Sequence, residues 1–288
     1  MARIGPMMNE GTPSPVAQAR AGTEARLPRP WTTWWIELFS TTPMLKLLGG
    51  IFLLGIWELI VRAFAPAYVA KPTGIIRVLP QTIVGKAILE GAGTTLWAVI
   101  QGIIIALILG TLVGLAMGHL KVVQRLLGIY INGLNAMPMI AILPLLTIWF
   151  GYSSAARLAT IVFAAFFPVA INLSDGARSV PSEYLDVARA YRARRRHIWF
   201  GVTLPSSLPY LLAGVRIAIG RALIGAVVAE FFISVDGLGF YILFQSRTFH
   251  HNEAFVAVLM LAIFASGVDA LINWLTRRYL RWYRAGTP

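Results

Sequence analysis

The sequence predicts an all-α membrane protein in which six helices cross the bilayer. Of its 288 residues, 57% are hydrophobic and only 13% are charged, whereas soluble domains carry about 25% charged residues. Six apolar segments approach or exceed the roughly 20 residues that a helix needs to span a bilayer. The formal net charge of +13 fits the cytoplasmic loops of a membrane protein, because nucleic-acid binding would require a basic face on a soluble fold. Membrane lipid is therefore an expected partner, and nucleic acid is not.

The six predicted spans follow one another along a single transmembrane domain over residues 46–280. The third contains two prolines, Pro138 and Pro144, and the fourth is the shortest. Their approximate limits are residues 45–64, 90–121, 125–157, 158–173, 208–233 and 254–276.

Residues 1–45 differ in composition from the rest of the chain. They are rich in Pro, Gly, Ala and Arg and lack the apolar stretch of a secretory signal peptide, which predicts a disordered cytoplasmic tail. Near its end, WTTWWIELF (31–39) holds three tryptophans. This segment is either an anchor at the membrane interface or a peripheral helix packed on protein.

The basic residues of the connections predict the orientation of the spans. Seventeen of the 25 Lys and Arg residues lie on the same side as the N-terminus and six on the other, with Arg216 and Arg221 inside the fifth span. Since cytoplasmic loops carry the excess of Lys and Arg, both termini are predicted to be cytoplasmic. The connection between the fourth and fifth spans, residues 178–206, then also lies in the cytoplasm.

Two segments have patterns that favour packing over chemistry. Residues 72–91 place apolar side chains at near-helical spacing, which predicts an amphipathic helix on the outer surface before the second span. Within the second span, Gly110, Gly114 and Gly118 follow the small-xxx-small spacing of closely packed membrane helices, and Gly102 lies in the same span.

The cytoplasmic connection contains DVARAYRARRRHIWFGVTLP (186–205), with five arginines between Arg189 and Arg196. Pro181, Ser182 and Glu183 precede it as signals for the start of a helix. The apolar stripe of that helix is Tyr184, Val187, Ala188 and Tyr191, and Arg189, Arg192 and Arg196 lie on another side. An apolar stripe in the cytoplasm needs a partner to bury it. Alternatively, the arginines only fix the topology and hold anionic lipid.

The same loop resembles the cytoplasmic signature of binding-protein-dependent ABC importer permeases. That signature is E-A-A, a glycine four residues after the second Ala, and I-x-L-P ten residues beyond the glycine. Here it reads Asp186-Val187-Ala188, Arg192 and Val202-Thr203-Leu204-Pro205, with the spacing intact. Similarity to the nitrate/sulfonate/taurine branch continues in MPMIAILPLLTIWFG (137–151), FFPVAINLSDG (166–176), LPSSLPYLLAGVRIAIGRALIGAVVAEFF and DGLGFYI. The resemblance covers roughly residues 70–280.

This resemblance implies a type I ABC importer-like permease of the bacterial inner membrane. The expected solute is small, such as a sulfonate or nitrate anion. The implied partners are two ABC ATP-binding subunits, a second permease copy in a homodimer, and a periplasmic or lipid-anchored substrate-binding protein. The chain has no P-loop pattern, so ATP hydrolysis, with bound ATP and Mg, is expected in the partner subunits, and no cofactor is expected in this chain.

The resemblance also implies that the loop forms a coupling helix seated in a groove of an ATP-binding subunit. The residues assigned to it are Glu183, Tyr184, Asp186, Val187, Ala188, Arg189, Tyr191, Arg192, Leu204 and Pro205. Arg192 departs from the signature glycine, which supplies turn conformations that arginine reaches only at a cost. Three explanations are open at this point: a longer helix, a turn elsewhere, or an adapted ATP-binding subunit.

Ionisable residues inside the fifth span are candidates for a translocation pathway. Arg216 and Glu230 lie 14 residues apart and so near one face of a helix, and Arg221 lies further round it. Charged groups at membrane depth usually face a cavity or a partner. Ion pairs between helices, or snorkelling toward the cytoplasm, are the alternative explanation. Asn135, Met137, Pro138 and Pro144 interrupt the third span, and interrupted helices commonly line cavities. The first three of them are added to the candidates.

Other chemistries find little support in the sequence. There is no cysteine, and His119, His250 and His251 have no carboxylate or thiol at ligand spacing, so no metal site is predicted. An ion-coupled secondary transporter or channel is the main alternative function, but such proteins often carry internal repeats and membrane-buried carboxylates. No repeat is visible, and the buried acids are scattered. A membrane enzyme would need clustered polar residues at one membrane face, and none are found.

Overall fold

The computed structural model describes residues 43–66 and 68–279, and all regular structure in these residues is helical. The described chain divides into two units between Leu59 and Ile60. Helix α3 (Pro43–Phe64) forms the first predicted span, and nearly all of its apolar side chains from Leu45 onward are exposed. The predicted tail at residues 1–45 and the tryptophan-rich segment fall on residues outside the described ranges, apart from the first turn of α3.

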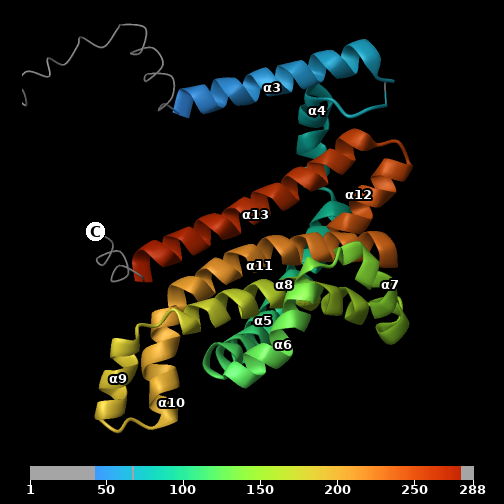
Figure 1. Cartoon of the computed structure of the whole chain (residues 1–288). Helices are drawn as coiled ribbons and strands as arrows, with labels where there is room; N and C mark the ends of the chain where they lie inside the picture. The colour runs from blue at the N-terminus through green and yellow to red at the C-terminus, as the bar shows by residue number, and fades with distance from the viewer. Residues whose placement is uncertain (1–42, 67, 280–288) are drawn as a thin grey trace, which may run out of the picture. The chain divides into compact units, whose positions relative to one another are not determined.

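The second unit contains the remaining helices, which are coloured in chain order in Figure 1. They are α4 (Pro72–Ile83), α5 (Lys86–His119), α6 (Lys121–Ala136), α7 (Met139–Phe150), α8 (Ser154–Arg178), α9 (Ser182–Ala190), α10 (Arg195–Ile198), η1 (Trp199–Thr203), α11 (Leu204–Ile233), α12 (Leu238–Arg247) and α13 (His251–Tyr279).

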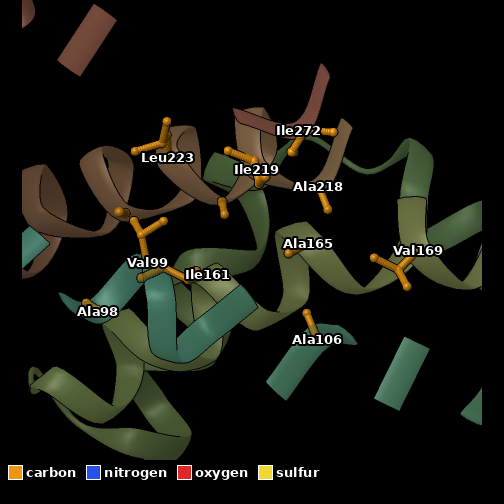
Figure 2. Packing of buried hydrophobic residues seen from close by; sticks show 12 residues of the cluster. Ala98, Val99, Ala106, Ile161, Ala165, Val169, Ala218, Ile219, Leu223 and Ile272 are labelled. Atoms are coloured by element: carbon orange, nitrogen blue, oxygen red, sulfur yellow. The ribbon is translucent and has the colours of Figure 1, made fainter. Parts of the chain in front are cut away.

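Helices α5, α8 and α11 pack together to form the core of this unit. Figure 2 shows Val99 of α5, Ile161 and Val169 of α8, and Ile219 and Leu223 of α11 in one apolar cluster. Because the chain lies in a membrane, close packing rather than water exclusion holds these helices together.

The glycines of the second span lie in a close helix contact, as predicted, and the structure identifies the partner as α8. A Cβ atom added at Gly102 would collide with the side chain of Ile161, and one at Gly118 with that of Ala177. At Gly114 it would lie 2.7 Å from the carbonyl oxygen of Ala170. The absence of a side chain at these positions therefore allows the two helices to approach closely.

The third predicted span is not a straight helix. Helices α6 and α7 meet at an angle of 106°, and counting this bent pair as one span gives up to six spans among the described residues. The break lies at Met137 and Pro138, both with extended backbone. Pro144, the other predicted interruption, lies inside α7 without ending it.

The fifth predicted span starts earlier than residue 208. Helices α10, η1 and α11 form one continuous helical segment of 39 residues, from Arg195 to Ile233. The wider turns of η1 come just before Pro205 and Pro209, residues that lack the amide needed to close an α-helical turn. The second and fourth spans also begin earlier than predicted, at Lys86 and Ser154.

Candidate functional site

Helix α9 lies where the sequence predicts a short amphipathic helix. It follows Pro181, carries Glu183 in its first turn and ends at Ala190. Three side chains of its apolar stripe are largely exposed: Tyr184 and Val187 at 58% each and Tyr191 at 85%. Ala188 is half-buried. The apolar stripe therefore has no cover within the described part of the chain.

Arg192 occupies the turn that ends α9, with a φ of +50°. The amide of Arg192 donates to the carbonyl of Arg189 at 2.8 Å, and the amide of Ala193 donates to the carbonyl of Ala188 at 3.0 Å. This pair of bonds is the Schellman pattern, whose left-handed position is usually a glycine. Of the three explanations left open by the sequence, the structure excludes a longer helix and a turn elsewhere. The turn lies at the signature position, and arginine adopts the conformation of the glycine.

The other residues assigned to coupling divide between α9 and the start of α11. Asp186 accepts a hydrogen bond from Arg189 at 2.9 Å on the exposed surface of α9. Leu204 is half-buried beside Leu115 and Leu173, and Pro205 is exposed. The end of the signature is thus helical and packs at the base of the loop, while α9 projects from it (Figure 1).

At the opposite end of α11, the carboxylate of Glu230 is fully buried and accepts three hydrogen bonds. Its Oε1 accepts from the hydroxyl of Thr95 at 2.8 Å and from Arg157 Nη1 at 3.3 Å, and its Oε2 accepts from the amide of Gly239 at 2.8 Å. The Thr95 hydroxyl in turn accepts from the amide of Leu238 at 2.8 Å. We call Thr95, Arg157, Glu230 and the first residues of α12 the outer cluster.

The outer cluster joins four helices and leaves no space beside the carboxylate. Arg157 of α8 also donates to the carbonyl of Asp236 at 2.8 Å. A Cβ atom added at Gly237 would overlap the carboxylate of Glu230, so glycine is needed there for this close approach. Such an arrangement fixes the start of α12 against α5, α8 and α11.

Sequence reasoning missed two members of the outer cluster. Arg157 was placed in a connection, because the fourth span was started after it, and no role was assigned to Thr95 in the second span. Ser153 caps α8, its hydroxyl accepting from the amide of Ala155 at 3.2 Å. That N-cap signal places Arg157 inside the helix and could have identified it.

The arginines of the fifth span contact different neighbours from Glu230. Arg216 Nε lies 2.9 Å from Asp269 Oδ1 of α13, in a half-exposed ion pair. Arg221 donates from Nη1 to the side-chain oxygen of Asn135 at 2.6 Å and to its carbonyl at 3.3 Å, at the end of α6. Met137 and Pro138 form the adjacent break between α6 and α7. Arg221 thus lies beside the interruption of the third span, whereas Glu230 lies in the outer cluster.

Comparisons with known proteins agree with this architecture. Residues 102–284 match the family model of the binding-protein-dependent transport system inner membrane component. The chain is 27% identical over 241 residues to the putative aliphatic sulfonates transport permease protein SsuC of Bacillus subtilis, covering 83% of this chain and 87% of that protein. It is 30% identical over 188 residues to the bicarbonate transport system permease protein CmpB of Synechococcus elongatus, covering 65% and 68%.

A solved structure has the same fold. A chain of the MetNI methionine ABC transporter, in an inward-facing conformation, aligns with a TM-score of 0.58 at 19% identity, covering 66% of this chain and 94% of that chain. Since the family model spans more than half of the sequence, the assignment does not depend on the cytoplasmic signature alone. The chain belongs to the family of inner-membrane components of binding-protein-dependent transport systems, the permease subunits of ABC importers.

Proposed function

We propose that the chain forms one half of an ATP-driven import pathway and that α9 receives the movement of an ATP-binding subunit. The observation that carries this proposal is the exposed apolar stripe of Tyr184, Val187 and Tyr191. Apolar side chains on a cytoplasmic helix gain free energy when a partner removes them from water, at about 25 cal/mol per Å². A groove on an ATP-binding subunit provides such a partner, and the family implies that subunit.

The connection from α9 to the transmembrane region supports a mechanical role. A turn of four residues, 191–194, links α9 to the helical segment that runs from Arg195 to Ile233. At 1.5 Å per residue its path is about 57 Å long, and it bends, because α10 and α11 run in different directions in Figure 1. Displacement of α9 would therefore move a helix that reaches the outer cluster, which is how nucleotide-driven closure of two ATP-binding subunits would rock two permease copies.

Arg221 supports a pathway for a small anion. It lies about 18 Å from the outer end of α11 at Ile233, hence near the middle of a bilayer core about 30 Å thick. Its side chain is exposed, as are the neighbouring Ile217 and Ile224. A charge facing lipid at this depth costs about 2.5–3.5 kcal/mol on insertion scales. We infer that a second permease copy and a water-filled pathway cover this face.

The remaining candidates are assigned by their position relative to Arg221. Asn135 holds the Arg221 guanidinium, and Met137 and Pro138 supply the break next to it, so these residues would line the same pathway. Arg216 would line it toward the cytoplasm. Glu230 is buried away from this face, and we assign it to the outer cluster instead of the pathway. A substrate-binding protein would deliver the anion at the outer side, as the family implies.

Co-purification with an ATP-binding subunit tests the role of α9. The full-length chain is solubilised from its host membrane, and the ATPase activity that co-purifies is measured for the wild type and for Val187→Asp with Tyr191→Asp. We expect the double variant to lose at least nine-tenths of that activity. Ser182→Asp is the control, because it adds a negative charge to the same helix about 140° round from Val187.

Two outcomes of the co-purification would contradict the proposal. If the double variant retains the ATPase, α9 is not the docking element. If the folded wild type brings down no ATPase, the proposal of an ATP-driven importer fails and an ion-coupled transporter becomes the better description.

Uptake into proteoliposomes tests the anion pathway, with methanesulfonate, taurine and bicarbonate as probes. The chain is reconstituted with its ATP-binding subunit and binding protein. We expect Arg221→Gln to lower uptake of the transported probe at least tenfold and Arg221→Lys to retain part of it, while Arg247→Gln on α12 leaves it unchanged. Wild-type uptake by Arg221→Gln would remove this residue from the pathway.

A further inference from the structure

A basic hollow of about 560 Å³ lies beside α9. Its basic wall consists of Arg189 of α9 and Arg195 and Arg196 of α10, and its apolar wall includes Trp199, Phe200 and the end of α5 at His119. We propose that this hollow binds the phosphate-bearing headgroup of an anionic phospholipid from the inner leaflet. The arginines would hold the phosphate, and the aromatic residues would contact the apolar part of the lipid.

Two of the three arginines in the basic wall have no carboxylate partner among the described residues. Arg195 and Arg196 are exposed, and no carboxylate of the described residues lies within ion-pair distance of either. Arg189 shares its charge with Asp186 at 2.9 Å. Guanidinium groups bind phosphate oxygens with two parallel hydrogen bonds. A phosphate would therefore supply the counter-charge that the chain itself does not provide.

The apolar wall contains aromatic rings of the kind found at the membrane–water boundary. The rings of His119 and Trp199 are stacked, with centroids 4.5 Å apart and an angle of 15° between their planes. Tryptophan is enriched at this boundary, where one side of the ring is apolar and the other is wet. Nε2 of His119 is buried and has no hydrogen-bond partner within the described ranges, so a ligand oxygen would satisfy it.

The depth of the hollow matches the inner headgroup layer. Along α5, His119 lies about 36 Å from Thr95 of the outer cluster, at 1.5 Å per residue. A bilayer with its headgroups is about 40–45 Å thick. When Thr95 lies near the outer boundary of the hydrocarbon, His119 lies near the inner one. The arginines then reach the leaflet whose surface potential is negative.

A lipid in this hollow would not compete with an ATP-binding subunit on α9. Arg189 lies about 200° round α9 from Val187, so the hollow and the apolar stripe face different directions. The two ligands would thus hold α9 from opposite sides.

Native mass spectrometry of the purified full-length chain tests the proposal, with phosphatidylglycerol and phosphatidylcholine as titrants. We expect the wild type to bind phosphatidylglycerol in preference to phosphatidylcholine. Arg195→Gln with Arg196→Gln should weaken phosphatidylglycerol binding about thirtyfold, because each arginine contributes about 1 kcal/mol near an anionic surface. Arg125→Gln, an exposed basic residue of α6 outside the hollow, should not change it.

A second variant tests the apolar wall independently. His119→Phe keeps a ring for Trp199 to stack on and removes the ring nitrogens, and we expect severalfold weaker binding of phosphatidylglycerol at unchanged thermal stability. Three outcomes would overturn the proposal. The first is that the double arginine variant binds phosphatidylglycerol as well as the wild type does. The second is that millimolar inorganic phosphate binds the same arginines and displaces the lipid, and the third is that the double arginine variant loses the ATP-binding subunit in nanodiscs of pure phosphatidylcholine. The second outcome would assign the site to a soluble phosphate, and the third would assign the arginines to the protein interface.

Discussion

The outer end of α11 and the cytoplasmic helix α9 differ in how their side chains are buried and paired. At the outer end, Glu230 is fully buried, and its carboxylate accepts hydrogen bonds from Thr95, Arg157 and Gly239. At the cytoplasmic end, α9 exposes Tyr184, Val187 and Tyr191 and ends in a left-handed arginine. The carboxylate at the outer end finds its partners within this chain, whereas the apolar stripe at the cytoplasmic end has no cover in the described residues.

If α9 has the role that we propose, this difference separates a part of the permease that holds its shape from a part that receives the movement of a partner. Buried charges retain a single arrangement because removing one partner leaves the other desolvated and unpaired. An exposed apolar helix on a short turn has no such constraint, so its position depends on what binds it. The continuous helix from Arg195 to Ile233 then connects an adjustable end to a fixed one.

Breaking the outer cluster should have the largest effect on stability. Glu230→Leu leaves the Arg157 guanidinium buried without its carboxylate, and Arg157→Met leaves the carboxylate without its cation. Each should lower the free energy of unfolding by about 3–5 kcal/mol, measured by SDS titration of the full-length chain in mixed micelles.

The double variant Glu230→Leu with Arg157→Met provides the control for this prediction. Replacing both charges by apolar groups is often nearly neutral, so the double variant should lose less free energy than the two single variants added together. If the losses simply add, the two residues do not act as a pair and the outer end is not held by this contact.

Overpacking the contact between α5 and α8 should have an intermediate effect on stability, and it extends the comparison along α5. Gly114→Ala forces a Cβ against the carbonyl of Ala170 at 2.7 Å, and overpacking of this kind costs about 1–3 kcal/mol. Gly93→Ala is a matched control in the same helix, since nothing lies within 4 Å of the added atom. The control should be neutral or stabilising by about 0.5–1 kcal/mol. The same SDS titration measures both, and equal effects would mean that the glycine contact is not tight.

The sequence predicted the helical membrane fold, the close packing of the α5 glycines and α9, because each depends on local spacing. The interruption of the third span at Met137 and Pro138 was also predicted, but its angle of 106° was not. Pro144, expected to interrupt the span as well, is accommodated inside α7. The outer cluster was missed because its members are far apart in the sequence, with Thr95 and Glu230 separated by 135 residues. A pattern within one helix shows that a charge is buried but cannot identify which distant residue pairs with it.

Relieving the left-handed turn of α9 should have the smallest effect, and it sharpens the contrast at the cytoplasmic end. Arg192 is held at a φ of +50°, which costs an arginine about 1 kcal/mol relative to glycine. Arg192→Gly should therefore slow exchange of the Ala193 amide about fivefold, measured by hydrogen–deuterium exchange of the full chain, without changing the SDS titration. Ala193→Gly is the opposite control, because it adds backbone freedom without relieving the left-handed residue and should speed exchange. If Arg192→Gly also speeds exchange, the arginine side chain stabilises the turn by a contact that outweighs its backbone cost, and the cytoplasmic end is less dependent on a partner than its exposed stripe indicates.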